Sequence, residues 1–278
     1  MPDNALPPID LVTRDEGEGP AVLLLHMVGG SHTVWNALVP ELAKEYHVLA
    51  PDLRGHGRTT APTGSLYTFD ELEGDLVRLL DAKSVDSAFV VGLSGGALLA
   101  LRLTLDHPKR VRGLVMVSGA AYTDNHTRSI SQRWAQTLRE EGRDAFGLRL
   151  LKDLYYPDWI EEHLDFADEV RATVDRQDFG PAEHWSAAME KFDERNRIGS
   201  VRVPTLIVQA MDDQVVDASH GRILRQSIPD SQIRILPQTG HLIPIERPAE
   251  TLEAISGFLK AAQKPRTSVA PPSGEGRS

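Results

Sequence analysis

Ser94 lies in the segment of the chain whose residue types and spacing most clearly suggest nucleophilic chemistry. Gly92-Leu93-Ser94-Gly95-Gly96 has the pattern Gly-x-Ser-x-Gly, which is typical of a sharp turn from a strand into a helix. Glycines on both sides leave room for a strained middle residue, whose hydroxyl then stands exposed. The amide of Gly95 would point toward a developing oxyanion. The alternative interpretation is a glycine-rich turn whose serine only caps a helix.

A serine hydroxyl needs a base to take its proton and a third group to orient that base. Of the ten histidines, His241 lies in a loop after the last predicted strand, and Asp212 and Asp213 follow the strand predicted at 205–209. Because the carboxyl ends of parallel strands meet at one edge of a sheet, these groups are expected on the same side. The resulting chain order is Ser, Asp, His. Position in the chain alone does not decide whether Asp212 or Asp213 would orient the histidine.

The segments that must position these residues alternate between strand and helix patterns. Apolar runs predict strands at 9–13, 21–26, 46–50, 87–91, 111–117, 205–209 and 232–236. Amphipathic or helix-forming runs predict helices at 34–45, 69–82, 97–105 and 248–262. Strands that are apolar on both faces and alternate with helices predict a mostly parallel α/β sheet flanked by helices on both sides.

This alternation stops between residues 121 and 200, where helical patterns follow one another without a strand. They predict helices at 129–141, 144–154, 158–176 and 182–195. A helical insert between two strands of one sheet suggests a cap over the edge where ligands bind. The expected organisation is a core of 1–120 and 201–263, a helical cap of 121–200, and a disordered tail of 264–278 rich in Pro, Ser and Gly.

Composition narrows the classes of function. With 278 residues, 41% hydrophobic and 25% charged, the chain has ordinary globular composition. A net charge of −10 argues against nucleic-acid and anionic-membrane partners. The absence of cysteine excludes disulfides and thiolate chemistry, and no histidine pair has metal-ligand spacing, so neither metal nor cofactor is expected. No signal-peptide pattern or membrane span is visible, so a cytoplasmic protein is expected.

Five ordered motifs together resemble the α/β-hydrolase fold family over residues 21–259. They are His26-Met27-Val28-Gly29-Gly30, the 51–59 turn with Arg54-Gly55-His56-Gly57, the 92–96 turn, Ala210-Met211-Asp212-Asp213, and Gly240-His241-Leu242 before Glu246-Arg247-Pro248. The resemblance implies that Ser94 is the nucleophile, His241 the general base and acid, and Asp213 the orienting carboxylate. Asp213 is preferred to Asp212 because its spacing from Ala210 matches the family pattern.

The same resemblance implies an oxyanion hole made of the backbone amides of Val28 and Gly95. The family usually has glycine after the histidine of this loop, whereas this chain has Met27. A positive φ would strain a methionine, so an ordinary backbone conformation is expected, with the side chain beside the acyl pocket. The predicted substrate-pocket residues are Met27, Leu93, Trp134 and Trp185.

These features predict a cofactor-independent serine hydrolase that cleaves a small carboxylic ester or lactone through an acyl-enzyme. Residues 180–204 loosely resemble 3-oxoadipate enol-lactonases and small bacterial esterases. Alternatives are a cofactor-free perhydrolase (haloperoxidase), a carbon–carbon bond hydrolase, which Leu93 disfavours because asparagine is usual there, and a hydrolase-fold ligand sensor with slow turnover. The sequence does not decide the physiological substrate, its chain length, the oligomeric state or which cap residues line the pocket.

Overall fold

The computed structural model describes residues 6, 8–61 and 67–263, and the tail expected at 264–278 lies outside them. Its centre is a seven-stranded sheet in the order β1-β3-β2-β4-β5-β6-β7, parallel except for β1, which pairs antiparallel with β3. The strands are β1 (Thr13–Glu16), β2 (Ala21–Leu25), β3 (His47–Pro51), β4 (Ala88–Leu93), β5 (Val111–Val117), β6 (Thr205–Ala210) and β7 (Ser231–Leu236).

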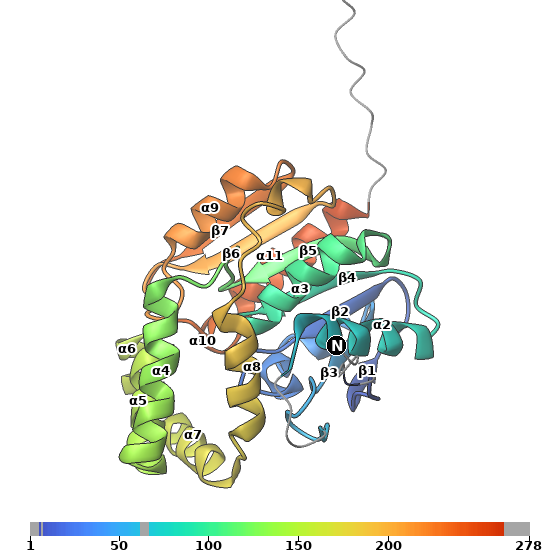
Figure 1. Cartoon of the computed structure of the whole chain (residues 1–278). Coiled ribbons are helices and arrows are strands. Elements are labelled where there is room, and N and C mark those ends of the chain that lie inside the picture. Colours follow the sequence, from blue (N-terminus) through green and yellow to red (C-terminus); the bar gives the residue numbers. More distant parts are fainter. Residues whose placement is uncertain (1–5, 7, 62–66, 264–278) are drawn as a thin grey trace, which may run out of the picture.

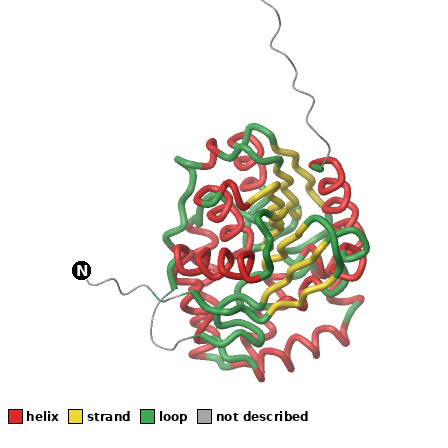
Figure 2. The backbone as a smooth tube through the Cα atoms, turned by 90° about the vertical axis from the view of Figure 1, so that its right-hand side faces the viewer, coloured by secondary structure: helices red, strands yellow, loops and turns green. Residues whose placement is uncertain are grey.

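Helices cover both faces of this sheet, as Figure 2 shows with the strands between two helical layers. One face packs against α2 (Phe69–Ala82), α3 (Gly95–Asp106) and α9 (Ser219–Ser227). The other packs against the 3₁₀ turn η1 (His32–Trp35), α1 (Val39–Leu42) and α11 (Pro248–Ala262). Strands β2, β4 and β6 are buried at every position, which explains why they read as continuous apolar runs.

Five helices lie between β5 and β6, at the carboxyl ends of the strands (Figure 1). They are α4 (Asn125–Glu140), α5 (Arg143–Leu154), α6 (Pro157–Glu162), α7 (Leu164–Arg176) and α8 (Gly180–Glu190). The two ends of this insert meet in an isolated antiparallel bridge between Tyr122 and Asp193. The insert therefore leaves and rejoins the sheet at one place.

The prediction of a strand at 9–13 is wrong, because the first strand is β1. Backbone amides of the predicted segment bind side chains instead of a neighbouring strand. The amide of Ile9 donates to Asp75 at 2.7 Å, and that of Val12 donates to Thr59 at 2.9 Å. These side-chain partners leave the segment outside the sheet.

Three helix predictions also need correction. The segment 34–45 forms η1 and α1 rather than one helix, since Pro40 has no amide hydrogen for a helical bond. The helix predicted at 158–176 divides into α6 and α7 at His163, whose φ of −131° and ψ of 55° are not helical. The last predicted cap helix, 182–195, is α8 and ends at Glu190. Helix α9 is not among the helices predicted from the sequence.

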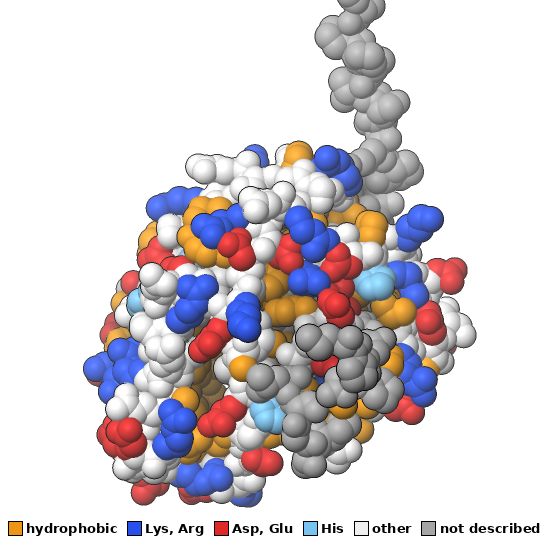
Figure 3. Space-filling model, in the orientation of Figure 1, with side chains coloured by type: hydrophobic (Ala, Val, Ile, Leu, Met, Phe, Trp, Pro, Cys, Tyr) orange, Lys and Arg blue, Asp and Glu red, His pale blue; other side chains and the backbone are white. Residues whose placement is uncertain are grey.

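No helix in the described part of the chain is long and apolar enough to cross a membrane. On the face shown in Figure 3, basic and acidic side chains are interspersed rather than gathered into a patch of one sign. The excess of acidic residues is therefore not concentrated on this face.

A cluster of charged side chains joins α2, α3 and the segment that follows the insert. Arg102 lies 3.5 Å from Glu73 and 3.1 Å from Glu194, and Arg197 pairs with Asp106 and Glu194. Glu73 is buried. Burial, with the nearby negative charge of Asp106, raises the pKa of Glu73 to about 8.

We expect Glu73→Gln to flatten the dependence of stability on pH. Because the pKa of Glu73 is higher in the folded than in the unfolded state, the folded protein holds this proton more tightly, and stability falls as pH rises from about 5 to about 8. The neutral variant should therefore melt above the wild type at about pH 9 and near it at about pH 5. Melting temperatures across this range, with exposed Glu18→Gln as control, test this. Parallel curves for wild type and Glu73→Gln would contradict it.

Candidate active site

Ser94 occupies the turn between β4 and α3. Its φ of 54° and ψ of −119° lie outside the ordinary regions for a residue with a side chain. The turn is fixed at both ends: the Ser94 amide donates to the Val117 carbonyl on β5 at 2.9 Å, and the Ser94 carbonyl accepts from the amides of Ala97 and Leu98. The strained conformation is thus held by the neighbouring strand and by the first turn of α3.

The flanking glycines are required by close approach of the backbone. A Cβ atom at Gly92 would lie 2.2 Å from the Gly96 carbonyl oxygen. A Cβ atom at Gly96 would lie 2.5 Å from the carbonyl oxygens of Leu25 and His26. Neither position can hold a side chain without moving main chain, so the strand and helix pack this closely only with glycine.

Asp213 and His241 meet in a buried hydrogen bond. Asp213 follows β6 and His241 follows β7, and His241 Nδ1 lies 2.8 Å from Asp213 Oδ2. The other carboxylate oxygen, Oδ1, accepts from the amides of Val215 at 2.8 Å and Val216 at 2.9 Å. This arrangement fixes the carboxylate and places the Nδ1 proton between the pair, which leaves Nε2 as the free ring nitrogen.

Asp212, the rival aspartate, takes a different position. Its amide donates to the carbonyl of Thr239 at 3.2 Å, and its carbonyl accepts from the side chain of Gln214. Among the described residues its carboxylate forms no hydrogen bond with His241. The geometry therefore favours Asp213, as the motif spacing does.

Two further contacts hold the backbone of His241. Its amide donates to the Leu154 carbonyl at the end of α5, at 2.8 Å, and its carbonyl accepts from Ser118 Oγ, also at 2.8 Å. Ser118 follows β5 and has a φ of 48°. Ser118 is not identified from the sequence, because it belongs to no motif and its contact spans 123 residues.

Glu246, at the end of α10 (Ile243–Glu246), fixes the loop before His241. Its buried carboxylate accepts from the amide of Gly240 at 3.0 and 3.1 Å and from that of Tyr156 at 3.0 Å. Burial raises the pKa of Glu246, and the two amides partly oppose this by favouring its charged form. A carboxylate within the apolar segment Ile243-Pro-Ile-Glu was the available sequence signal for this role.

The loop after β2 approaches the start of α3. A Cβ atom at Gly95 would lie 2.7 Å from Val28 Cγ2, so the two predicted oxyanion residues are neighbours. Neither backbone amide donates a hydrogen bond to a described residue. Met27 does not have a positive φ, whereas Gly29, two residues later, has a φ of 74°. The expectation of an ordinary backbone conformation at Met27 is therefore confirmed.

Two neutral histidines hold this loop. His26 Nε2 accepts from the Leu53 amide at 2.9 Å, and His56 Nε2 accepts from the Gly29 amide at 3.0 Å. Burial, together with the nearby ring of His56, lowers the pKa of His26 to about 3, and burial lowers the pKa of His56. An uncharged ring is needed in both places because a protonated nitrogen could not accept these bonds.

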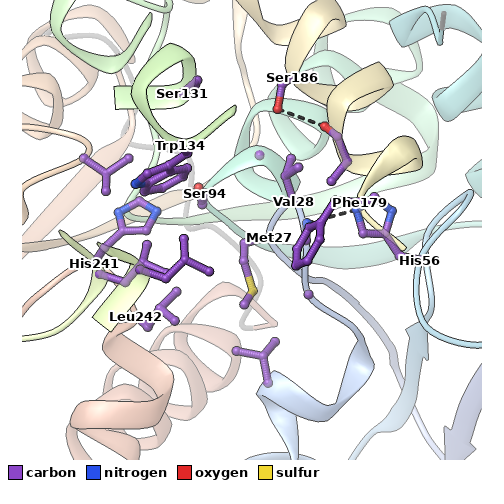
Figure 4. A pocket seen from close by; sticks show the side chains of 18 of the residues that line it. Met27, Val28, His56, Ser94, Ser131, Trp134, Phe179, Ser186, His241 and Leu242 are labelled. Atoms are coloured by element: carbon purple, nitrogen blue, oxygen red, sulfur yellow. Dashed lines mark hydrogen bonds between the residues drawn. The ribbon is translucent and has the colours of Figure 1, made fainter. Parts of the chain in front are cut away.

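Ser94 and His241 line one cavity of about 1180 Å³, together with Met27, Val28 and Trp134. Figure 4 shows Ser94, His241, Trp134 and Met27 among the side chains that line the cavity. Within the described residues no hydrogen bond joins the side chains of Ser94 and His241. Such bonds are often long before substrate binds. The cavity thus offers a hydroxyl, an imidazole with its carboxylate, and two backbone amides that donate no hydrogen bond to a described residue.

Two predicted pocket residues do not line this cavity. Leu93 is fully buried among side chains on the α11 face of the sheet. Trp185 is buried on the opposite face, where its Nε1 donates to the carbonyl of Arg54 at 3.0 Å. Each residue is part of the core, so the prediction of Leu93 and Trp185 as pocket residues is wrong.

No cluster of three or more potential metal ligands occurs in the described part of the chain.

The sheet, the strained serine turn and the cavity at the strand ends define an α/β hydrolase. The chain belongs to the α/β-hydrolase fold family, whose model matches residues 20–248. The family and the fold predicted from the sequence are therefore confirmed.

Individual relatives agree with this assignment. The chain is 30% identical to RutD of Azorhizobium caulinodans, a carbamate hydrolase by name, over 90% of this chain and 94% of the relative. It is 27% identical to 3-oxoadipate enol-lactonase 1 of Acinetobacter baylyi, covering 88% and 90% of the two chains. The enol-lactonase structure from Burkholderia xenovorans matches with a TM-score of 0.83 and 27% identity, covering 90% and 96%. The activity shared by these relatives is hydrolysis.

We expect Gly96→Ala to destabilise the protein by about 3 kcal/mol, because the new methyl group would force main chain apart in a packed region. Gly257→Ala in α11 is the matched control. Nothing lies within 4 Å of a Cβ atom there, so the control should be neutral or stabilising by up to about 1 kcal/mol. Urea unfolding of the three proteins measures both changes. Equal stability of Gly96→Ala and wild type would contradict the role of the close approach.

Proposed function

We propose that this protein is a serine hydrolase that cleaves a carboxylic ester or lactone through an acyl-enzyme. The observation that carries the proposal is the buried Asp213–His241 hydrogen bond, 2.8 Å long, beside Ser94 at the wall of one cavity. A carboxylate that fixes the histidine tautomer leaves Nε2 unprotonated, as a general base requires.

In the proposed mechanism Ser94 Oγ attacks the carbonyl carbon while His241 Nε2 takes its proton. The amides of Val28 and Gly95 stabilise the oxyanion of the tetrahedral intermediate. His241 then gives the proton to the leaving oxygen, and the acyl-enzyme forms. Water attacks the acyl carbon with His241 again as base, and the carboxylic acid leaves. The Asp213 carboxylate stabilises the imidazolium in both steps.

The choice of ester or lactone is supported by the names of the relatives, two of which are enol-lactonases. The carbamate hydrolase by name would attack a carbonyl carbon as well. An ester, a lactone and a carbamate would use the same nucleophile and oxyanion donors. They differ in that a lactone keeps its leaving oxygen tethered to the acyl group and a carbamate carries nitrogen on the reacting carbonyl carbon. A test panel therefore has to contain all three.

The cavity walls favour a substrate whose polar atoms are confined to the scissile group. Apolar side chains from α5 and α7 line one side, including Phe146, Leu150 and Val170. Three of the polar side chains in the lining bind the protein itself: Gln177 donates to Gly29, Ser186 to Ala182 and Thr123 to Met189. The hollow between α4 and α8 shows hydrophobic side chains (Figure 3). We therefore place the hydrocarbon part of the substrate against α5 and α7.

Ser94→Ala should lower turnover of short p-nitrophenyl esters at least about a thousandfold, because the nucleophile is lost. Asp213→Asn should lower it by a similar factor, since the histidine loses its orienting charge. The neighbouring Asp212→Asn is the matched control and should stay within about threefold. Steady-state kinetics on an ester, a lactone and a carbamate measure these effects.

The same measurements separate an enzyme from a ligand sensor. Slow turnover of every class by the wild type, with no loss in Ser94→Ala, would refute hydrolysis as the function. Thermal shifts by the same compounds in that case would indicate a sensor. Turnover of the carbamate alone would correct the substrate class and keep the mechanism.

Leu150→Trp should reduce hydrolysis of p-nitrophenyl octanoate about tenfold more than hydrolysis of the acetate, because the larger ring fills the apolar side of the cavity. Leu148→Trp on the same helix is the control, since Leu148 is 51% exposed and lies outside the cavity lining. The ratio of kcat/KM for the two esters is the measurement. An unchanged ratio in Leu150→Trp would place the acyl chain elsewhere.

A further inference from the structure

The first turn of α4 is hydrogen-bonded to the loop that carries Asp213. Thr127 Oγ1 donates to the Val215 carbonyl at 3.0 Å, and His126 Nε2 lies 2.8 Å from the Gln214 carbonyl. The two acceptors are consecutive carbonyls of the acid loop, residues 213–216. A helix of the insert therefore contacts main chain that directly follows the carboxylate.

These carbonyls belong to the peptide groups that hold Asp213. The Gln214 carbonyl shares its peptide group with the Val215 amide, and the Val215 carbonyl shares its group with the Val216 amide. Both amides donate to Asp213 Oδ1. Because a peptide group is planar, a bond that fixes its carbonyl also fixes the direction of its amide. His126 and Thr127 thus set the orientation of the two donors.

Side-chain packing reinforces the same contact. Val215 and Val216 are buried in a small cluster with Ala120 and Ile130, against which Trp134 packs. Ile130 and Trp134 lie on α4, one and two turns beyond Thr127. The acid loop is therefore held against α4 by its side chains as well as by its carbonyls.

The helix start is itself anchored. Asp124 Oδ1 accepts from the Thr127 amide at 2.8 Å and caps α4, while Asp124 Oδ2 lies 3.2 Å from Nε2 of buried His220 on α9. Thr127 is consequently linked through Asp124 to the core helix α9.

We propose that Thr127 and His126 are positioning residues for the proposed catalytic carboxylate, acting on Asp213 through the Gln214 and Val215 peptide groups. The expected effect on kcat rests on the proposed function. The expected effect on the orientation of Asp213 rests on geometry alone. The insert would then contribute to the alignment of the Asp213–His241 pair as well as to the cavity wall.

The test is a set of variants in the full chain: Thr127→Val, which removes the hydroxyl at nearly constant shape, Thr127→Ser, which keeps it, and His126→Ala. Loss of one neutral hydrogen bond should lower kcat about threefold to tenfold in Thr127→Val, with KM changed less than about twofold. Thr127→Ser should keep kcat near the wild-type value. His126→Ala should have a smaller effect of the same kind, because its bond is exposed to water.

Ser129→Ala is the matched control on the same turn. Ser129 Oγ donates to the His126 carbonyl, is exposed and does not line the cavity. Its removal should leave kcat, KM and melting temperature near wild-type values. A comparable loss in Ser129→Ala would show that any disturbance of this turn is sufficient, which would overturn the specific role of Thr127.

A second measurement needs no turnover. Nitrogen NMR of histidine-labelled protein, with the signals of His241 identified by their loss in His241→Ala, reports which ring nitrogen carries the proton. Wild type and Thr127→Ser should hold the proton on Nδ1, and Thr127→Val should show a mixture of tautomers. Unchanged tautomers in Thr127→Val, or a mixture already in the wild type, would overturn the proposal. If no ester, lactone or carbamate is hydrolysed, the proposed function fails while this measurement still decides the positioning role.

Discussion

The structure depends on the close approach of α3 to β4 and to the end of β2, where Gly92 and Gly96 respectively leave no room for a Cβ atom. This contact forces Ser94 into a strained conformation and holds its hydroxyl above the sheet. The strain is balanced by the rest of the fold: β4 lies in the middle of the sheet, paired on both sides with fully or largely buried strands. A less central strand would give less support against relaxation of the turn.

Around this turn, the loops after β2, β5, β6 and β7 converge on one cavity, and each is fixed by a different kind of group. Neutral histidines hold the first, the Ser118 hydroxyl links the second to the fourth, and a pair of amides holds Asp213 in the third. Glu246 is a further anchor of the loop after β7, and it accepts bonds from both that loop and the insert. Except for the amides of the Asp213 loop itself, the site is therefore assembled from contacts between segments distant in sequence.

This distribution explains which features the sequence could predict. The helix at 69–82 was predicted with correct bounds because its apolar spacing is regular and Thr68 begins a capping box. The proposed nucleophile, base and acid were found because local motifs and chain order identify them. Ser118 and Thr127 were not, since their roles come from contacts of 123 and 88 residues in sequence separation. Leu93 and Trp185 were misplaced because a motif does not tell on which side of the main chain a side chain packs.

The Leu154 carbonyl at the end of α5 accepts from the His241 amide, and the backbone of Tyr155 and Tyr156 leaves no space for a side chain at Gly240. This junction between insert and core has a consequence for engineering. A foreign insert grafted in place of residues 121–200 to change selectivity would have to reproduce the junction as well as form a new cavity wall. Grafts that keep the native junction near Leu154 and vary only the distal ends of α5 and α7 would separate selectivity from alignment of the base.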